Sequence, residues 1–349
     1  MKARTKEIIR DGFGSLVSNA SAMRGAKAGP LWLTIVMFFL AILLPIIPIF
    51  VQQATTNGST FLDKYSYNLD RTVTSVAMDL KNNRNAEFII GEDHLLTIKE
   101  GENVVNFNDY GSDNIYASYI SFPGTDHPEY ELVVYLSTAE TDKEKENFLN
   151  EVNLINFAWN STYRTDSATS IYHPNMIVFF RSGVYVSIYA DTGTNVISNS
   201  FIGDFKTIAP GNNYLEKFLT VEGVAQNLYD VNYTNGVYAN FKKFMDKSYE
   251  TLKIKNTGLT CLLYFGIFFG ASLLMGLLMF LLTRGKNNPN NYFSLWLCLK
   301  IQGRLSFCPG LITMIIGFFL TSQIPLFMIM LLGLRVMWIS MKELRPIAQ

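Results

Sequence analysis

Residues 31–51, LWLTIVMFFLAILLPIIPIFV, and residues 259–282, LTCLLYFGIFFGASLLMGLLMFLL, decide the fold of this 349-residue chain. Neither stretch contains an Asp, Glu, Lys, Arg or His. Each is long enough to cross a bilayer as one helix, which takes about 20 residues. A third apolar stretch, residues 305–341, carries one charge and is interrupted at residues 322–325, SQIP. The pattern predicts a polytopic α-helical membrane protein.

Charge is divided unevenly along the chain. Residues 52–258 contain 26 acidic and 16 basic residues, a net charge of −10, and the rest of the chain carries +10. Apart from Arg335, the basic residues of the rest flank the apolar stretches, in residues 1–30, 283–304 and 342–349. Lys and Arg in short loops stay on the cytoplasmic side during insertion, so these three segments are expected to face the cytosol. Residues 52–258 then lie outside.

This orientation requires about four transmembrane helices. The first apolar stretch is expected to remain as an anchor, because it begins 30 residues into the chain and no small-x-small cleavage site follows it. The predicted segments are a basic cytoplasmic segment (1–30), helix 1 (31–51), an extracytoplasmic domain (52–258), helix 2 (259–282), a cytoplasmic loop with an interfacial helix (283–304), helix 3 (305–321), helix 4 (326–341) and a cytoplasmic tail (342–349).

The extracytoplasmic domain is predicted to be α+β. Residues 88–98 and 178–188 each read as two apolar runs around a polar turn, which predicts two β-hairpins and suggests a duplicated unit. Residues 130–136 alternate as a strand, and residues 141–154 form a charged helix. Residues 235–255 carry apolar side chains at helical spacing and are expected to continue into the second span.

Cysteine usage indicates the compartment. Cys261, Cys298 and Cys308 lie in or beside the apolar stretches, and the exported domain has none. An animal extracellular domain of this size usually carries disulfides, so we expect a bacterial plasma membrane.

No motif in the chain predicts catalysis, a cofactor or a metal. Walker A, G-x-S-x-G and H-E-x-x-H patterns are absent, and His94, His127 and His173 lie far apart. Asp126, His127 and Glu129 could hold a metal but are more typical of a polar turn. The acidic domain argues against nucleic acid as a partner, because phosphate binding needs a basic surface. The sequence therefore favours a protein that is not an enzyme.

Within the spans, three features are candidates for function. Gly266, Gly270 and Gly276 are candidates for close helix packing, either within this chain or against another subunit. Arg335 is the one charge in an apolar span, and it either reaches the cytoplasmic headgroups or pairs with a backbone carbonyl or a partner protein. Pro45 and Pro48 are expected to kink the first span, as a hydrated kink or as a flexible joint to the outer domain.

The order of these segments resembles a known family. A basic segment with FGSLVS (13–18) precedes a proline-ended span, IVFFRSGVYV (177–186) lies in the exported domain, and YFSLWLCLK (292–300) precedes a span that opens with Pro309. The chain is similar in this layout to the DUF1189 family of Gram-positive bacteria, polytopic membrane proteins of which some are called maltodextrin-utilization proteins. The resemblance implies a plasma-membrane protein near sugar-uptake systems, and it carries no catalytic residues over.

Two functions remain open. In the first, the outer domain binds a ligand or partner while the helices associate with a membrane complex, as an accessory to transport. In the second, the chain is itself a homo-oligomeric channel or transport component. The absence of acidic residues from the spans weighs against a carrier made of one copy.

Overall fold

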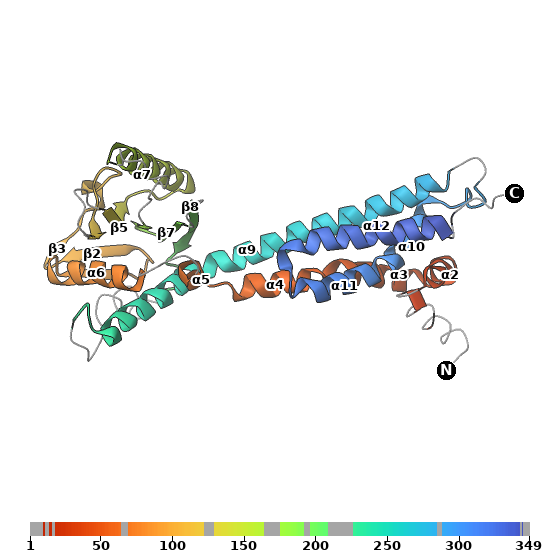
Figure 1. The fold of residues 1–349 in the computed structure, drawn as a ribbon, viewed down its shortest axis with the longest axis horizontal. Coiled ribbons are helices and arrows are strands. Elements are labelled where there is room, and N and C mark those ends of the chain that lie inside the picture. Colours follow the sequence, from red (N-terminus) through yellow and green to blue (C-terminus); the bar gives the residue numbers. More distant parts are fainter. Residues whose placement is uncertain are drawn as a thin grey trace. The chain divides into compact units, whose positions relative to one another are not determined.

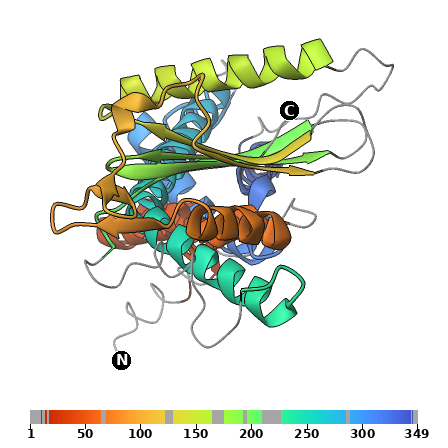
Figure 2. The same ribbon diagram turned by 90° about the vertical axis from the view of Figure 1, so that its left-hand side faces the viewer.

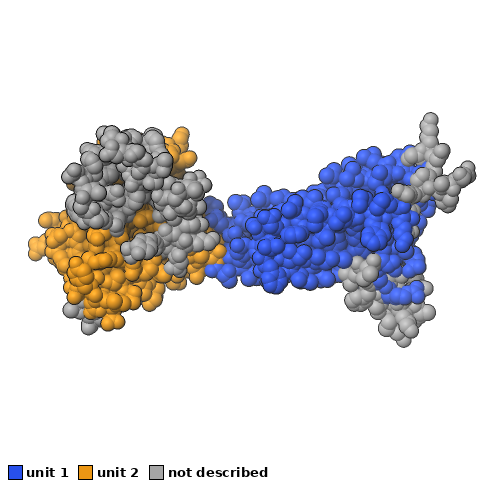
Figure 3. Space-filling view, viewed as in Figure 1, with its two compact units in different colours: residues 1–55, 255–349 blue, residues 56–254 orange. Residues whose placement is uncertain are grey.

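The chain forms two compact units. A computed structural model describes residues 18–63, 69–121, 129–163, 175–191, 196–208, 226–284 and 288–342, together with residues 10, 14, 15 and 344. Residues 56–254 form one unit, called here the sheet unit, and residues 1–55 and 255–349 form the other, called the membrane unit (Figure 3). The boundaries expected from sequence, 52 and 258, lie four residues outside those of the sheet unit.

A five-stranded sheet organises the sheet unit. Its strands pair in chain order, and all neighbours are antiparallel except β5 and β6, which are parallel. A parallel pair needs a crossover connection, and helix α7 supplies it. The strands are β4 (Ala117–Ser121), β5 (Glu129–Ser137), β6 (Asn175–Phe180), β7 (Gly183–Asp191) and β8 (Val196–Asp204), and α7 is Asp142–Tyr163.

Helices cover both faces of this sheet (Figure 2). On one face, Leu149 and Val152 of α7 pack with Val133 of β5. On the other face, α6 (Leu69–Asn82) and the first part of α9 (Val231–Leu282) pack with the alternate residues of β5, including Val134. Successive side chains of the strand thus point to opposite faces of the sheet and pack in two separate apolar layers.

A small second sheet adjoins the first. It consists of β1 (Ala86–Ile90), β2 (Leu96–Glu100) and β3 (Asn103–Val104), and 3-10 helix η1 (Phe107–Asp109) follows it. The backbone N–H of Leu96 donates to the carbonyl of Arg181, 2.7 Å away, and so ties β2 to the turn between β6 and β7. Helix α5 (Gly58–Asp63) packs near β8.

Most of the predicted elements of this unit are confirmed. Both hairpins, the strand at 130–136 and the helices at 141–154 and 235–255 are present. The two hairpins belong to different sheets and have different neighbours, and the suggested duplication stays a prediction. Helix α9 also runs without a break into the second apolar stretch, so one helix contributes residues to both units.

Among the described residues of the membrane unit, every regular element is a helix (Figure 1). Three stretches are long and apolar enough to span a membrane: Leu31–Thr55, Val231–Leu282 and Thr321–Lys342. Helices α10 and α11 are separated only by Ser306, whose backbone is itself right-handed helical at φ −65°, ψ −22°. Besides α9, the elements are α2 (Asn19–Ala28), α3 (Leu31–Leu43), α4 (Ile46–Thr55), α10 (Leu295–Leu305), α11 (Phe307–Gly317), η2 (Thr321–Gln323) and α12 (Ile324–Lys342).

Candidate functional site: an arginine pair in the membrane unit

Glycines at intervals of seven residues bring α10 and α11 against the first apolar stretch. A Cβ atom at Gly303, Gly310 or Gly317 would stand within 3.4 Å of an atom of that stretch. At Gly310 it would collide with backbone of Ala41, so only glycine allows the approach there, whereas at Gly303 the nearest atoms are side-chain carbons 3.3 Å away. The facing residues also recur every seven positions and rise together with the glycines, which makes the two helical segments parallel. The pairs are Gly303 with Thr34, Gly310 with Ala41, and Gly317 with Pro48.

Two prolines leave a backbone carbonyl without its helical donor at this contact. Proline has no N–H, so the carbonyl four residues earlier loses its partner. Pro45 does this to Ala41, and α3 accordingly ends at Leu43 before α4 begins at Ile46. The carbonyl of Ala41 lies directly against Gly310. Pro48 is the third residue of α4, in the first turn, where a backbone N–H would have no partner within the helix, so Pro48 does not end α4.

The second such carbonyl belongs to Leu305, four residues before Pro309, and it accepts a hydrogen bond from an arginine. Nη1 of Arg335, on α12, donates to this oxygen at 3.2 Å. The same guanidinium donates to the carbonyl of Ser15, and its Nε lies 3.4 Å from Oδ1 of Asn19. Of the two alternatives that the sequence left open for Arg335, the structure shows pairing with backbone carbonyls.

A second arginine, Arg304, is 1% exposed. Its Nε donates to Oγ1 of Thr34 at 2.9 Å, and its guanidinium lies so close to Gly25 and Gly29 that a side chain at either glycine would collide with it. The sequence placed Arg304 only among the basic residues of a loop. Its burial was missed, because the small residues that make room for it lie far away in the chain, before the first span.

Arg304 and Arg335, called here the arginine pair, hold helix α2 in place. The side chain of Ser18 caps α2 by accepting from the N–H of Ser21 at 3.4 Å. Small residues form its buried face, and Lys27 at its end donates to the hydroxyl of Tyr292 at 3.2 Å. The residues of this face are Ser21, Ala22, Gly25 and Ala26. The sequence predicted only a basic segment here, although small residues at helical spacing were a usable signal.

The three glycines singled out in the second span do not share a face. At 100° per residue, Gly276 lies about 240° around the helix from Gly270. Gly276 packs against Leu299, whereas a Cβ on Gly266 or Gly270 would meet no atom of the described chain within 4 Å. Intrachain packing is therefore found only for Gly276. The other alternative, a contact with another subunit, remains for Gly266 and Gly270.

The sheet unit presents ordered polar groups but no reactive constellation in its described part. The carboxylate of Glu100 accepts from the hydroxyl of Tyr116 at 3.0 Å and from Nη1 of Arg84 at 3.2 Å. Burial, together with the negative charge of Glu100, raises the pKa of Tyr116 well above its ordinary value, so this tyrosine stays protonated.

Metal ligands do not gather among the residues that the structure describes, where no three His, Cys, Asp or Glu side chains could hold an ion together. His94 sits in the turn between β1 and β2 at φ 59°, a turn position in the left-handed region. His173 lies outside the described residues. So does the candidate turn at 126–129, except for Glu129, which is the first residue of β5.

Comparisons with protein-family models, curated proteins and solved structures give no match to this chain. The resemblance to the DUF1189 family therefore stays a prediction.

Proposed function

We propose that the chain is a non-enzymatic, multi-pass protein of a bacterial plasma membrane that acts as an accessory to sugar uptake of the maltodextrin type. Its sheet unit lies outside the cell and binds a ligand or partner. Its helices associate with a membrane complex. The N- and C-termini are cytoplasmic.

Four spans follow from the pairing of helices in this proposal. Because α10–α11 runs parallel to α3–α4 through the glycine contacts, it crosses the membrane in the same direction as the first span. Helix α12 then returns. The sequence predicted this third crossing over 305–321, after an interfacial helix in the loop 283–304. In the proposal the crossing instead begins within α10, the predicted interfacial helix, and continues through α11 across the helical connection at Ser306. The uneven distribution of charge supports cytoplasmic ends.

The observation that carries the proposal is a cleft at the start of α9, the helix that continues into the second apolar stretch. The cleft has a volume of about 280 Å³ and is lined by Tyr229, Asp70 and Asn235 among others. Tyr229 is 80% exposed, and the guanidinium of Arg71 lies over one face of its ring, 5.5 Å from the centroid. The other face of the ring, beside a carboxylate and an amide, suits a sugar ring. The same helix continues into the membrane unit, so a ligand in the cleft contacts an element that also packs among the spans.

The first test asks whether a transporter co-purifies with the chain. Full-length chain carrying an affinity tag is purified from its own host in mild detergent, and co-purifying proteins are quantified by mass spectrometry. The proposal expects sugar-transporter subunits at a fixed ratio to the chain. Recovery of the chain alone as a homo-oligomer would favour the alternative, a self-contained channel or transport component. The exposed Gly266 and Gly270 are the observation that favours that alternative.

Sugar binding is tested on the same purified protein. Maltose to maltoheptaose are titrated by calorimetry against the full-length chain and the Tyr229→Ala variant. Binding that is lost in this variant, and kept in a Tyr292→Ala control with another exposed tyrosine, supports the proposed site. Absence of binding by the unmodified chain removes the sugar from the proposal.

A further inference from the structure

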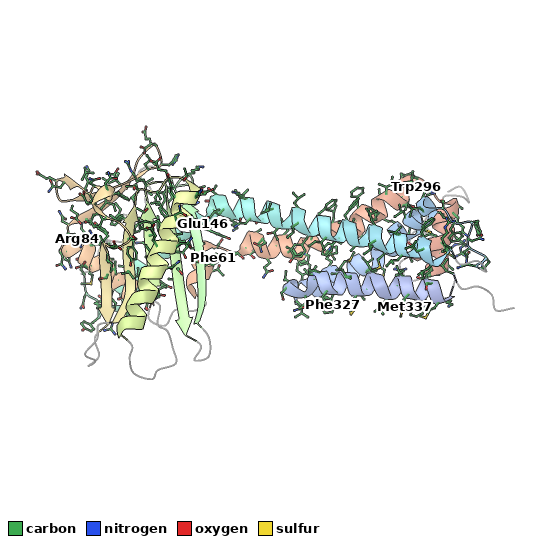
Figure 4. All side chains as sticks on the ribbon, turned by 90° about the horizontal axis from the view of Figure 1, so that it is seen from above. Phe61, Arg84, Glu146, Trp296, Phe327 and Met337 are labelled. Carbon is green, nitrogen blue, oxygen red and sulfur yellow. The ribbon has the colours of Figure 1, made fainter. Side chains whose placement is uncertain are left out.

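A groove of about 740 Å³ lies among α11, α12 and the start of α2 in the membrane unit. Its polar end is formed by Arg335 and Lys342 together with the first residues of α2. Its apolar part is formed largely by one side of α12, including Leu334, Met337 and Trp338. Figure 4 shows Met337 and Phe327 on this helix. The volume is in the range of small-molecule sites.

The apolar part of the groove is open to the surroundings of α12. Leu334 and Met337 are each 50% exposed, and Trp338 is 62% exposed. Because α12 belongs to a stretch that is long and apolar enough to span a membrane, side chains on its outside face hydrocarbon. Exposed tryptophan near the charged end of a span is typical of the interface between chains and headgroups. The groove thus adjoins lipid along its length.

The polar end is suited to negative charge. None of the described residues that line the groove is acidic, whereas Arg335 and Lys342 are both basic. Helix α2 begins at this end, and the positive end of its dipole adds to the two side chains. Basic pockets between spans bind the headgroups of anionic lipids. Two cations beside an apolar surface that opens to hydrocarbon match a molecule that has both an anionic headgroup and an acyl chain.

We propose that this groove binds an anionic phospholipid, with its phosphate between Arg335 and Lys342 beside Trp338, and an acyl chain along Leu334, Leu331 and Ile312. Arg335 also holds Ser15 and Asn19, so the bound headgroup lies against the guanidinium that docks the N-terminal segment. The inference rests on the proposed function only in treating these helices as spans. It does not depend on which partner the chain has.

Trp338 is the reporter. Trp32, Trp159 and Trp296 are replaced by Phe in the full-length chain, which leaves Trp338 as its one tryptophan. The protein is placed in nanodiscs of phosphatidylcholine that contain the same mole fraction of either brominated phosphatidylcholine or brominated phosphatidylglycerol. Both leaflets carry the brominated lipid, so the result does not depend on orientation. Quenching of Trp338 is expected to be several-fold more effective with the glycerol lipid.

Two variants locate the preference. Lys342→Gln should weaken the preference for phosphatidylglycerol about fivefold, the effect of one positive charge near an anionic headgroup. Lys300→Gln, which removes a charge from α10 outside the groove, should leave it unchanged. Met341→Glu, which places a carboxylate at the groove, should abolish it.

Equal quenching by the two lipids in the unmodified groove would overturn the inference. So would an equal loss in the Lys342→Gln and Lys300→Gln variants, which would mean general attraction to the surface. Protection of Trp338 from both lipids would overturn it too, and would show that a second copy of the chain fills the groove. Failure to recover a transporter partner leaves all these readings intact.

Discussion

The two units of this chain pair their buried and half-buried arginines with different groups. In the sheet unit, Arg84 is paired with the carboxylate of Glu100. In the membrane unit, Arg304 and Arg335 are held by the hydroxyl of Thr34 and by the carbonyls of Ser15 and Leu305. Acidic residues are scarce there, with three outside residues 52–258. A carbonyl that proline deprives of its N–H partner takes the place of the carboxylate.

The units also differ in what fills their cores. Aromatic side chains fill the sheet unit, where Phe179 lies 5.4 Å from Phe88 and 6.4 Å from Phe244 between ring centroids. In the membrane unit, backbone lies against backbone at Gly310 and Ala41. Removing a side chain should therefore harm the first unit most, and adding one should harm the second.

Phe179→Ala should have the largest effect. The side chain is 1% exposed between two other rings, and a Phe-to-Ala change in a core costs about 3–5 kcal/mol. Thermal unfolding of the full-length chain in detergent, with limited proteolysis to identify the unit that opens, should show loss of the sheet unit. Ile202→Ala, at a side chain 38% exposed on β8, is the control and should shift unfolding much less.

Gly310→Val should come next. Its side chain would collide with the carbonyl of Ala41, and overpacking of this kind costs about 1–3 kcal/mol. Unfolding in mixed micelles of rising SDS content measures the loss. Gly266→Val is the matched control, because a Cβ there meets no described atom within 4 Å. An equal loss of stability in both variants would mean that Gly310 is no more tightly packed than Gly266.

Arg335→Leu should cost less, about 1 kcal/mol, the scale of a hydrogen bond between spans. The carbonyl of Leu305 would lose its donor, and the N-terminal segment would lose its contacts at Ser15 and Asn19. The measurement is thiol labelling of Ser18→Cys in a cysteine-free background. Labelling should become faster with Arg335→Leu and stay unchanged with Lys342→Gln. No change in the Leu variant would show that Arg335 does not hold α2.

The smallest effect is expected from pH at the start of α7. Glu144 accepts hydrogen bonds from the N–H groups of Thr141 and Glu140, and these lower its pKa. Because the folded-state pKa is lowered, this stabilisation is complete above the ordinary value of 4.5 and is lost as pH falls through the folded value. Hydrogen-exchange protection of these two amides should fall over that range. In a Glu144→Gln variant it should be low and independent of pH.

Local patterns made the sheet unit largely predictable. The turns at residues 91–95 and 181–182 lie between apolar runs, and neighbouring residues alone fix such hairpins. The helix at 235–255 was predicted from its apolar spacing, and so was its continuation into the span. The pairing of β5 with β6 was not predictable in this way, because it joins strands on either side of α7.

The contacts of the membrane unit were less accessible from sequence. The seven-residue spacing of Gly303, Gly310 and Gly317 was present in the sequence, but close helix packing was predicted from the GxxxG pair at Gly266 and Gly270 instead. The bond from Arg335 to Leu305 depends on how α12 lies against α11. No rule of composition or period gives that arrangement.

Cysteine labelling in intact cells tests the central claim, that four spans place the sheet unit outside and the arginine pair at the cytoplasmic end. Single cysteines are placed at three exposed positions, Glu140, Asn291 and Ser322, in a cysteine-free chain and treated with an impermeant maleimide. Glu140→Cys and Ser322→Cys should react at once, and Asn291→Cys only after permeabilisation. Reaction of Asn291→Cys in intact cells, or protection of Ser322→Cys, would contradict the account.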